Sequence, residues 1–501
     1  MRRSGATQLR TLALGVLAIL SLAARASRAD QDWRQSRYDA RNTAMVELTA
    51  PRSAPPRAWT FEGSGRVWGY EPGMTVWSSP ALAVIEDRAL LAVGSYDRNV
   101  YALDAATGEV RWRFTTGAPV FATPAIGRKG GQPLLVAASN DRLVYGIDPL
   151  LGRTLWVHSV EEYRPTLGGA RLSAPCLTTV RGEEAAIVGH WVWDRSLGGN
   201  LQRGGLSALR LEDGRPLWQQ PLGDNEVTAP IAATVRGAGR LFVGSTNGNI
   251  YAVRADDGRL LWQHTEHDAV RSPPAFLDGE RPLVVMASKY GAVRALDAET
   301  GREVWHHKTG DRITGAPAVL PIGGRLAVVV GSYDRGLYAL DAASGALRWR
   351  YTARGGVFSS PALAPGGRPL VLVSAWDHLL HAVGLEDGAV RFTTFTGRPL
   401  WNVAGLDEST WSSPAVARLN GHLMAYVGSY DGRLRALPLD DPERAASPGR
   451  SNLWFWLSFP LSLGPLALLA ALLSRRERQR RRRRCQETTS HAATIRTGAA
   501  A

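Results

Sequence analysis

A stretch of about 44 residues recurs seven times in this chain, and an eighth time in two separated pieces. One copy begins at Trp77-Ser-Ser-Pro-Ala, continues through Val93-Gly-Ser-Tyr-Asp and ends at Arg111-Trp-Arg-Phe. A fixed period of this length indicates that one small unit is repeated. The way in which the copies stack therefore decides the whole fold.

Each copy contains four short runs rich in Val, Leu, Tyr and Trp, separated by Gly and Asp turns. This pattern is typical of a four-stranded antiparallel meander. Each copy also enters through two small residues and a proline, and these prolines are Pro80, Pro124, Pro175, Pro230, Pro274, Pro317, Pro361 and Pro414. Four strands per repeat at this period predict an all-β, eight-bladed propeller with four-stranded antiparallel blades.

The eighth copy starts at Trp411 and runs to Leu437, but no aromatic fourth strand follows it. The missing strand is found near the other end of the chain, where Arg57-Ala-Trp-Thr-Phe matches Arg111-Trp-Arg-Phe. We therefore expect an N-terminal strand to complete the last blade. Such closure removes the exposed sheet edges that would otherwise promote aggregation.

Segments on both sides of the repeats have the character of targeting and membrane sequences. An apolar run from Thr11 to Ala23 follows three arginines and precedes small-x-small sites, as in a signal peptide. Leu453 to Leu473 are apolar and would span about 32 Å as a helix. The predicted organisation is a signal peptide (1–29), an N-terminal arm (30–58), the propeller (59–441), a linker (442–452), a transmembrane helix (453–473) and a basic tail (474–501).

The charges indicate the orientation of this predicted membrane protein. Eight arginines lie between residues 475 and 484, and the positive-inside rule places such a tail in the cytoplasm. The propeller would then be periplasmic or otherwise extracytoplasmic. Of the formal net charge of +14, five charges precede residue 30 and seven follow residue 473, which leaves about +2 elsewhere. A nucleic-acid role for the propeller is not supported by so small a charge.

In each copy, an Asp occupies one of two positions in the turn between the third and fourth strands. It occupies the first position in Asp104, Asp148, Asp297 and Asp341, and the second position in Asp213, Asp257, Asp387 and Asp441. We expect each Asp to accept backbone N–H bonds that organise the turn. These repeated carboxylates are therefore poor candidates for catalysis.

Leu337 to Trp349 read Leu-Tyr-Ala-Leu-Asp-Ala-Ala-Ser-Gly-x-x-x-Trp, and Trp33 begins a lead-in of Trp-Arg-Gln-Ser-Arg-Tyr-Asp. Both resemble the PQQ-type propeller repeats of quinoprotein dehydrogenases and of the lipoprotein propeller that assists outer-membrane barrel assembly. The resemblance covers roughly residues 33 to 441 and implies the fold. It does not by itself imply a function, because the shared motif is the scaffold.

The longest departures from the period predict a functional face, because insertions fall in the loops before the first strand and between the second and third strands. The residues just before the small-small-Pro motifs should surround the mouth of the central channel. In blades three and four, the residue one position earlier, Arg171 or Glu226, is included as well. The candidate binding face then contains Trp77, Phe121, Arg171, Glu226, Arg271, Phe358 and Trp411. Such a mouth could hold a planar acid or a peptide; alternatively, its aromatic side chains only plug the channel.

Three further tryptophans extend this predicted face. The insertion after His190 adds Trp191 and Trp193, and Trp376 occupies a loop that carries tyrosine in other blades. Exposed Trp is typical of binding hot spots for a protein partner.

Two function classes follow from these observations. The first is a non-catalytic, monomeric propeller, tethered to the membrane by its C-terminal helix, that serves as a protein-interaction or assembly scaffold without a cofactor or metal. The alternative, implied by the resemblance, is a quinoprotein dehydrogenase that uses PQQ with calcium. That enzyme needs a carboxylate base and oxygen ligands, and the repeat alignment places only Glu226 at the mouth. The sequence favours the binding protein and names no catalytic residue.

Overall fold

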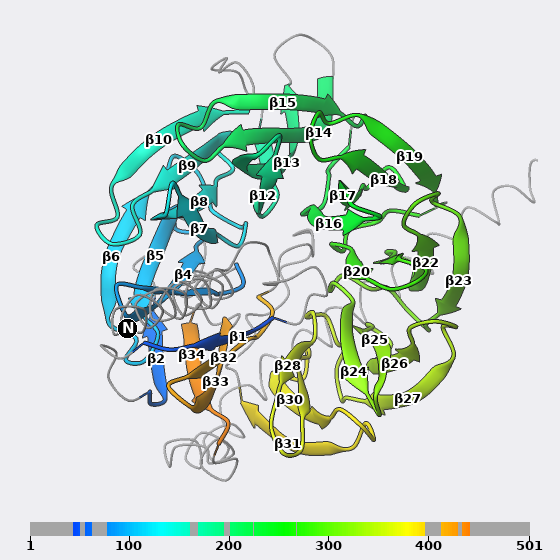
Figure 1. Ribbon diagram of the computed structural model, residues 1–501. Helices are drawn as coiled ribbons and strands as arrows, with labels where there is room; N and C mark the ends of the chain where they lie inside the picture. The colour runs from blue at the N-terminus through cyan, green and yellow to red at the C-terminus, as the bar shows by residue number, and fades with distance from the viewer. Residues whose placement is uncertain are drawn as a thin grey trace, which may run out of the picture. The chain divides into compact units, whose positions relative to one another are not determined.

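The computed structural model describes residues 44–50, 56–62, 78–160, 169–194, 201–223, 225–266, 268–395, 412–428 and 433–440. The chain divides into two compact units, Met1–Ala446 and Ser447–Ala501, and all described residues belong to the first. The described residues form the predicted eight-bladed propeller (Figure 1). They include no helix that is long and apolar enough to cross a membrane. The predicted signal peptide, linker, transmembrane helix and basic tail lie outside them.

Six blades are four-stranded antiparallel meanders in chain order. Blade one contains β3 (Ala81–Ile85), β4 (Arg88–Gly94), β5 (Asn99–Asp104) and β6 (Val110–Thr115). Blade two contains β7 (Ala125–Lys129), β8 (Gln132–Ala138), β9 (Leu143–Ile147) and β10 (Thr154–Ser159). Blade four contains β16 (Ile231–Val235), β17 (Ala238–Gly244), β18 (Asn249–Arg254) and β19 (Leu260–Thr265).

The same order continues around the ring. Blade five contains β20 (Ala275–Leu277), β21 (Leu283–Ala287), β22 (Ala292–Asp297) and β23 (Glu303–Lys308). Blade six contains β24 (Ala318–Ile322), β25 (Arg325–Gly331), β26 (Gly336–Asp341) and β27 (Leu347–Thr352). Blade seven contains β28 (Ala362–Ala364), β29 (Leu370–Ser374), β30 (Leu379–Gly384) and β31 (Val390–Phe395).

Blade three has the four expected strands and one more. They are β12 (Cys176–Val180), β13 (Glu183–Asp194), β14 (Leu201–Arg210) and β15 (Pro216–Pro221), with β11 (Gly169–Leu172) as the addition. The insertions that the sequence analysis treated as loops lengthen β13 and β14 to 12 and 10 residues. β11 pairs antiparallel with the far end of β13.

Blade eight is assembled from both ends of the propeller. It contains β32 (Ala415–Leu419), β33 (His422–Gly428) and β34 (Arg433–Pro438), and β2 (Trp59–Glu62) pairs antiparallel with β34 as predicted. The sequence analysis missed β1 (Met45–Leu48), which pairs in parallel with β32 and makes this blade five-stranded. The Asn420 side chain fixes the end of this addition, because its Oδ1 accepts from Ala50 N at 2.8 Å and its Nδ2 donates to Ala50 O at 2.9 Å.

Tryptophan docks seven of the eight blades onto the next, and blade seven carries Phe392 at this position. The Trp59 ring lies against Gly108, where a Cβ would approach within 2.5 Å, and its Nε1 donates to Ala105 O at 3.1 Å. Gly108 has φ +77°, a conformation that favours glycine. The contact recurs for Trp112, Trp156, Trp218, Trp262, Trp305 and Trp349, each with its own glycine and carbonyl in the following blade.

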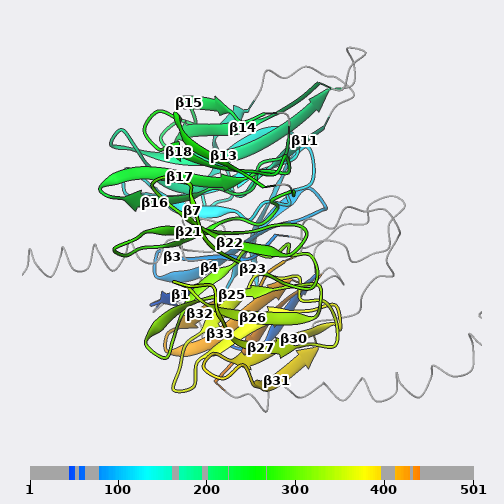
Figure 2. The same ribbon diagram turned by 90° about the vertical axis from the view of Figure 1, so that its right-hand side faces the viewer.

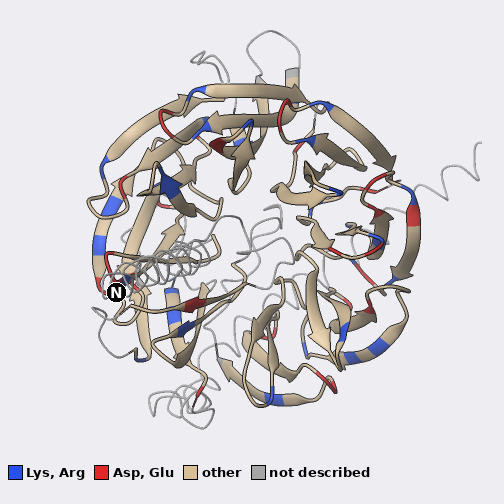
Figure 3. Cartoon of the chain, in the orientation of Figure 1, with Lys and Arg blue, Asp and Glu red and all other residues tan. Residues whose placement is uncertain are grey.

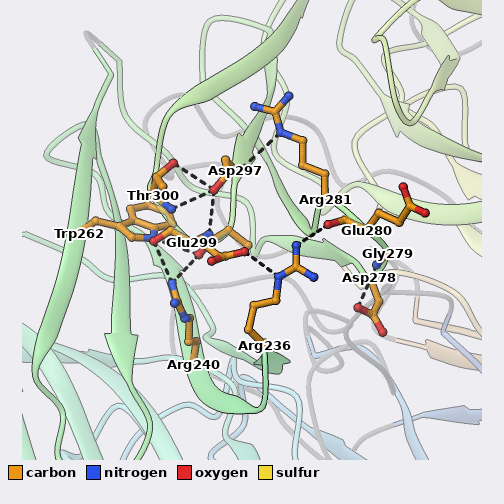
Figure 4. Close-up of polar contacts among 11 residues, drawn as sticks. Arg236, Arg240, Trp262, Asp278, Gly279, Glu280, Arg281, Asp297, Glu299 and Thr300 are labelled. Atoms are coloured by element: carbon orange, nitrogen blue, oxygen red, sulfur yellow. Dashed lines mark hydrogen bonds and ion pairs between the residues drawn. The ribbon is translucent and has the colours of Figure 1, made fainter.

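The Asp turns have the structural role that the sequence predicted. Asp297 Oδ1 accepts from the N–H groups of Glu299 and Thr300 at 3.1 and 3.0 Å, and Arg240 and Trp262 donate to the carbonyls of the same turn (Figure 4). At the second position, Asp213, Asp257 and Asp387 likewise each accept a backbone N–H, at 3.1, 3.1 and 3.0 Å. Asp441 lies outside the described residues. The hydrogen bonds to Asp297 help to hold its pKa below the usual range against the opposing effect of burial.

Burial decreases from the channel to the rim of each blade. In blade one, the side chains of β3 and β5 are all buried, whereas those of β6 alternate between half-buried and exposed. The inner strands are covered on both faces by neighbouring blades, so they form near-continuous apolar runs rather than alternating ones. Charges of both signs are distributed around the ring (Figure 3).

Candidate binding site at the channel mouth

The entries into the first strands of the blades surround a cavity of about 180 Å³. Successive strands are antiparallel, so each entry and each turn between second and third strands lie at the same end of a blade. This end is therefore the mouth face of the channel, and the Asp turns lie at the opposite end. Five residues singled out from the sequence line the cavity, namely Phe121, Arg171, Glu226, Arg271 and Phe358.

The remaining predicted residues have other positions. Trp77 and Trp411 lie outside the described residues. Trp376 is 36% exposed and packs edge to face against Tyr333, with ring centroids 4.7 Å apart. The Arg312 guanidinium lies 4.8 Å from the centroid of the same tyrosine ring. Across the ring, Phe121 packs on Tyr96 at 5.6 Å, so aromatic pairs occupy the mouth face in blades one, two, six and seven.

Arg171 and Glu226 form an ion pair across the mouth. Arg171 Nη1 lies 3.2 Å from Glu226 Oε2, and both side chains are somewhat under one-third exposed. The carboxylate that could have served as a base is thus engaged by a guanidinium from the neighbouring blade. Arg271 adds a second positive charge to the lining, so the described ionisable groups of the cavity, two Arg and one Glu, sum to +1.

The ends of β13 and β14 that meet the added strand β11 extend beyond the length of the other blades' strands (Figure 2). Trp191 and Trp193 lie on this part of β13. The two residues are on the same face of β13, and their ring centroids are 4.5 Å apart. Residues directly opposite in the sheet are Arg171 for Trp191 and Gly169 for Trp193. Both tryptophan rings are therefore held on a hydrogen-bonded sheet rather than on a loop.

His190 is the neighbour of this tryptophan pair on β13 and points to the other face. It is 9% exposed, and its Nδ1 lies 3.4 Å from Ser207 Oγ. Burial penalises the charged imidazole and lowers the pKa of His190 to about 4. The ring is thus a neutral component of the hairpin at pH 7.

Hydroxyl groups form a girdle around one part of the channel. In four consecutive blade junctions, the residue before the proline donates its backbone N–H to the side-chain oxygen of the equivalent residue in the next blade. These bonds are Ala316 N to Ser360 Oγ (2.8 Å), Ser360 N to Ser413 Oγ (3.0 Å), Ser413 N to Ser79 Oγ (3.0 Å) and Ser79 N to Thr123 Oγ1 (3.2 Å). We call this chain of bonds, from blade six to blade two, the hydroxyl girdle.

The hydroxyl girdle was not predicted, although the residues before the prolines indicate it. The position before the proline holds Ser or Thr in blades seven, eight, one and two, but Ala174, Ala229 and Pro273 in blades three to five. The charged residues Arg171, Glu226 and Arg271 belong to those same three blades. The loss of the hydroxyls and the gain of charge thus coincide.

A quinone cofactor with calcium would need several oxygen ligands for the metal among the residues that line the mouth. Calcium takes six to eight oxygen ligands, usually with several carboxylates. Glu226 is the only carboxylate among the described lining residues and is paired with Arg171. No group of three His, Cys, Asp or Glu with metal-ligand geometry occurs in the described part of the chain. The described residues therefore do not fit calcium.

The family model for the outer membrane protein assembly factor BamB matches residues 33–237, 202–312 and 289–446. The chain belongs to this family. The match begins at the lead-in with Trp33 and continues through all eight blades, as the resemblance of the repeats predicted. The comparison with curated protein sequences found no match.

Solved structures agree on the fold. The quinohemoprotein alcohol dehydrogenase from Comamonas testosteroni has a TM-score of 0.62 at 14% identity, with 85% of this chain and 83% of that chain covered. The corresponding enzyme ADHIIG from Pseudomonas putida HK5 has a TM-score of 0.55 at 13% identity, over 82% and 81%. BamB from Moraxella catarrhalis is 17% identical over 76% and 97%, with a TM-score of 0.47. The two alcohol dehydrogenase structures show that this BamB-family chain shares their propeller fold, and at 13–14% identity they show nothing about its activity.

Proposed function

We propose that this BamB-family chain is a non-catalytic, membrane-tethered scaffold whose propeller binds a protein partner outside the cytoplasm. The observation that carries the proposal is the Trp191–Trp193 pair on the lengthened β13–β14 hairpin. Neither the hairpin extension nor β11 is needed to build a blade, since six blades consist of four short strands without them.

The physical properties of the hairpin suit partner recognition. Tryptophan side chains contribute more than most residues to the free energy of protein association. Backbone pairing across β11, β13 and β14 holds both rings before a partner arrives. A preorganised surface avoids part of the entropy that binding otherwise costs.

The sequence supports the proposed location. A signal peptide before residue 30 would direct the propeller across the membrane, and residues 453–473 would anchor it there. β34 ends at the face opposite the mouth and is the last described strand before the predicted linker.

Site-specific photocross-linking in native membranes tests the partner face. A photoreactive residue at Gln202, which lies opposite Trp193 in the sheet, should give a discrete adduct with the full-length chain. The double variant Trp191→Ala/Trp193→Ala should reduce that adduct at least tenfold. Leu151, which is 62% exposed in the β9–β10 turn at the opposite face, provides the matched control for both the probe and the Ala substitution. Equal adducts from both positions, or an adduct that survives loss of both tryptophans, would refute the proposal.

The alternative of a PQQ-dependent oxidoreductase is favoured by one observation. Phe121 and Phe358 line the same cavity as Arg171 and Arg271, so an aromatic side and a cationic side face each other. Addition of PQQ and calcium to the full-length chain, with absorbance and dye-linked dehydrogenase activity recorded, distinguishes the two functions. A bound quinone spectrum with turnover would replace the scaffold proposal.

A further inference from the structure

The hydroxyl girdle stops where its acceptors are missing. By the geometry of the other junctions, the N–H groups of Thr123, Ala174 and Ala229 should donate to the next blade. The positions that would accept them are held by Ala174, Ala229 and Pro273, which have no side-chain oxygen. Among the described residues, none of these three N–H groups has an acceptor.

The three residues that carry these donors are buried and line the mouth cavity. Thr123, Ala174 and Ala229 are 6%, 7% and 8% exposed, and all three line the cavity of about 180 Å³. A buried backbone N–H without an acceptor is destabilising, and such groups are rare in native proteins. An acceptor that is not part of the described chain is therefore expected in this part of the channel.

The surrounding charge indicates which acceptor is favoured. Convergent backbone N–H groups form concavities that attract anions. Arg171 and Arg271 outnumber Glu226 in the same lining, so the described charges also favour an anion. The cavity is smaller than the roughly 300–1,000 Å³ of pockets for drug-sized molecules, which suits a small group.

We propose that the channel mouth between blades two and five binds a carboxylate, whose oxygens accept from the free backbone N–H groups beside Arg271. The carboxylate belongs either to a small free acid or to the C-terminus of a peptide, because both present the same group. The carboxylate binds to the N–H groups that have no hydroxyl acceptor in the next blade. This binding requires neither Trp191 nor Trp193. Loss of partner adducts and loss of carboxylate binding can therefore be observed separately.

Calorimetric titration of the full-length chain in detergent tests the site with two matched probe pairs. Succinate is compared with succinamide, and N-acetyl-Ala-Ala is compared with its C-terminal amide. Each acid that serves as a source should bind at least tenfold more tightly than its amide. The pair that shows this preference identifies the source as a free acid or a chain terminus.

A second set of variants tests the donors by supplying the missing hydroxyls. Ala174→Ser provides an acceptor for Thr123 N–H, and Ala229→Ser provides one for Ala174 N–H. The double variant Ala174→Ser/Ala229→Ser should weaken acid binding at least tenfold, since two donors are then occupied. Ala316→Ser is the matched control, because the preceding blade has Pro273 at the donor position and therefore no N–H to occupy. Its affinity for the acids should stay within twofold of the parent.

Arg271→Gln provides an independent readout that does not alter the girdle. It should weaken the acids at least threefold and leave the amides unchanged. The proposal is overturned if neither acid binds at about 10 mM, if acids and amides bind equally, or if the double variant binds as tightly as Ala316→Ser. Any of these results would mean that the mouth holds no carboxylate site.

Discussion

Two regions of the same ring use one repeat in different ways. From blade six to blade two, the residues before the prolines join neighbouring blades through the hydroxyl girdle. In blades three to five the hydroxyls are replaced, charged residues surround the channel, and blade three gains a long hairpin. The comparison shows that one repeat can join its blades through hydroxyl groups in one arc and carry charged residues in another.

The docking of tryptophan on glycine should be the same in both regions. Gly258 and Gly388 both have positive φ and both face a tryptophan ring, in the charged arc and the girdle arc respectively. Gly258→Ala and Gly388→Ala should each lower the free energy of unfolding by about 4 kcal/mol, through left-handed backbone strain and overpacking. Denaturant unfolding of both variants measures this. A loss confined to one variant would show that the arcs differ in blade docking as well.

The charged arc should also respond to pH through His190. Its pKa is lowered to about 4 in the folded state, so the unfolded chain binds the proton more readily between pH 4 and pH 6.5. Stability from this group is therefore complete above about pH 6.5, and about 3 kcal/mol is lost as the pH falls to 4. Unfolding curves at several pH values should show a flatter dependence for His190→Gln. An unchanged slope would contradict the buried neutral ring.

Removal of one girdle hydroxyl should leave a backbone N–H without its acceptor, as at the junctions that lead into blades three to five. Ser79→Ala takes away the acceptor of Ser413 N–H, which lies 3.0 Å from Ser79 Oγ. The expected loss of unfolding free energy is about 2 kcal/mol, because a buried donor is left unpaired. Thermal unfolding measures the change. A loss below about 0.5 kcal/mol would mean that water replaces the hydroxyl without cost.

The reverse substitution should have the smallest effect. Ala174→Ser adds an acceptor for Thr123 N–H and should raise the free energy of unfolding by about 1 kcal/mol. Ala316→Ser adds the same atom where no donor exists and should be neutral or slightly destabilising. Equal effects of the two substitutions in a side-by-side unfolding measurement would contradict the conclusion that Thr123 N–H lacks an acceptor.

Much of the fold could be predicted because the repeat carries its own signals. The 44-residue period predicted the number of blades and their four strands. The match between Trp59 and Trp112 identified the strand that closes the ring. β1 was missed because it has only four residues and its partner β32 lies about 370 positions away. Its alternation of exposed and buried residues is too short to distinguish a strand from an extended arm.

The candidate site was predictable where position in the repeat determines position in space. Phe121, Arg171, Glu226, Arg271 and Phe358 share one repeat position or its neighbour, and they line one cavity. The long β13–β14 hairpin was not predicted, because an insertion in a repeat is ordinarily a loop. The Arg171–Glu226 pair and the girdle depend on contacts between blades, which the pattern within one blade does not determine.

The five-stranded blade eight has a mechanical consequence. β1 pairs with the inner strand of this blade, β32, and β2 pairs with β34 on the outer side. One short stretch of chain, residues 45–62, therefore contributes both edge strands of the sheet. The first and last described strands of the propeller thus share a single blade. A tension applied between residues 44 and 440 would act across the β1–β32 and β2–β34 pairings and would leave the other seven blades unloaded.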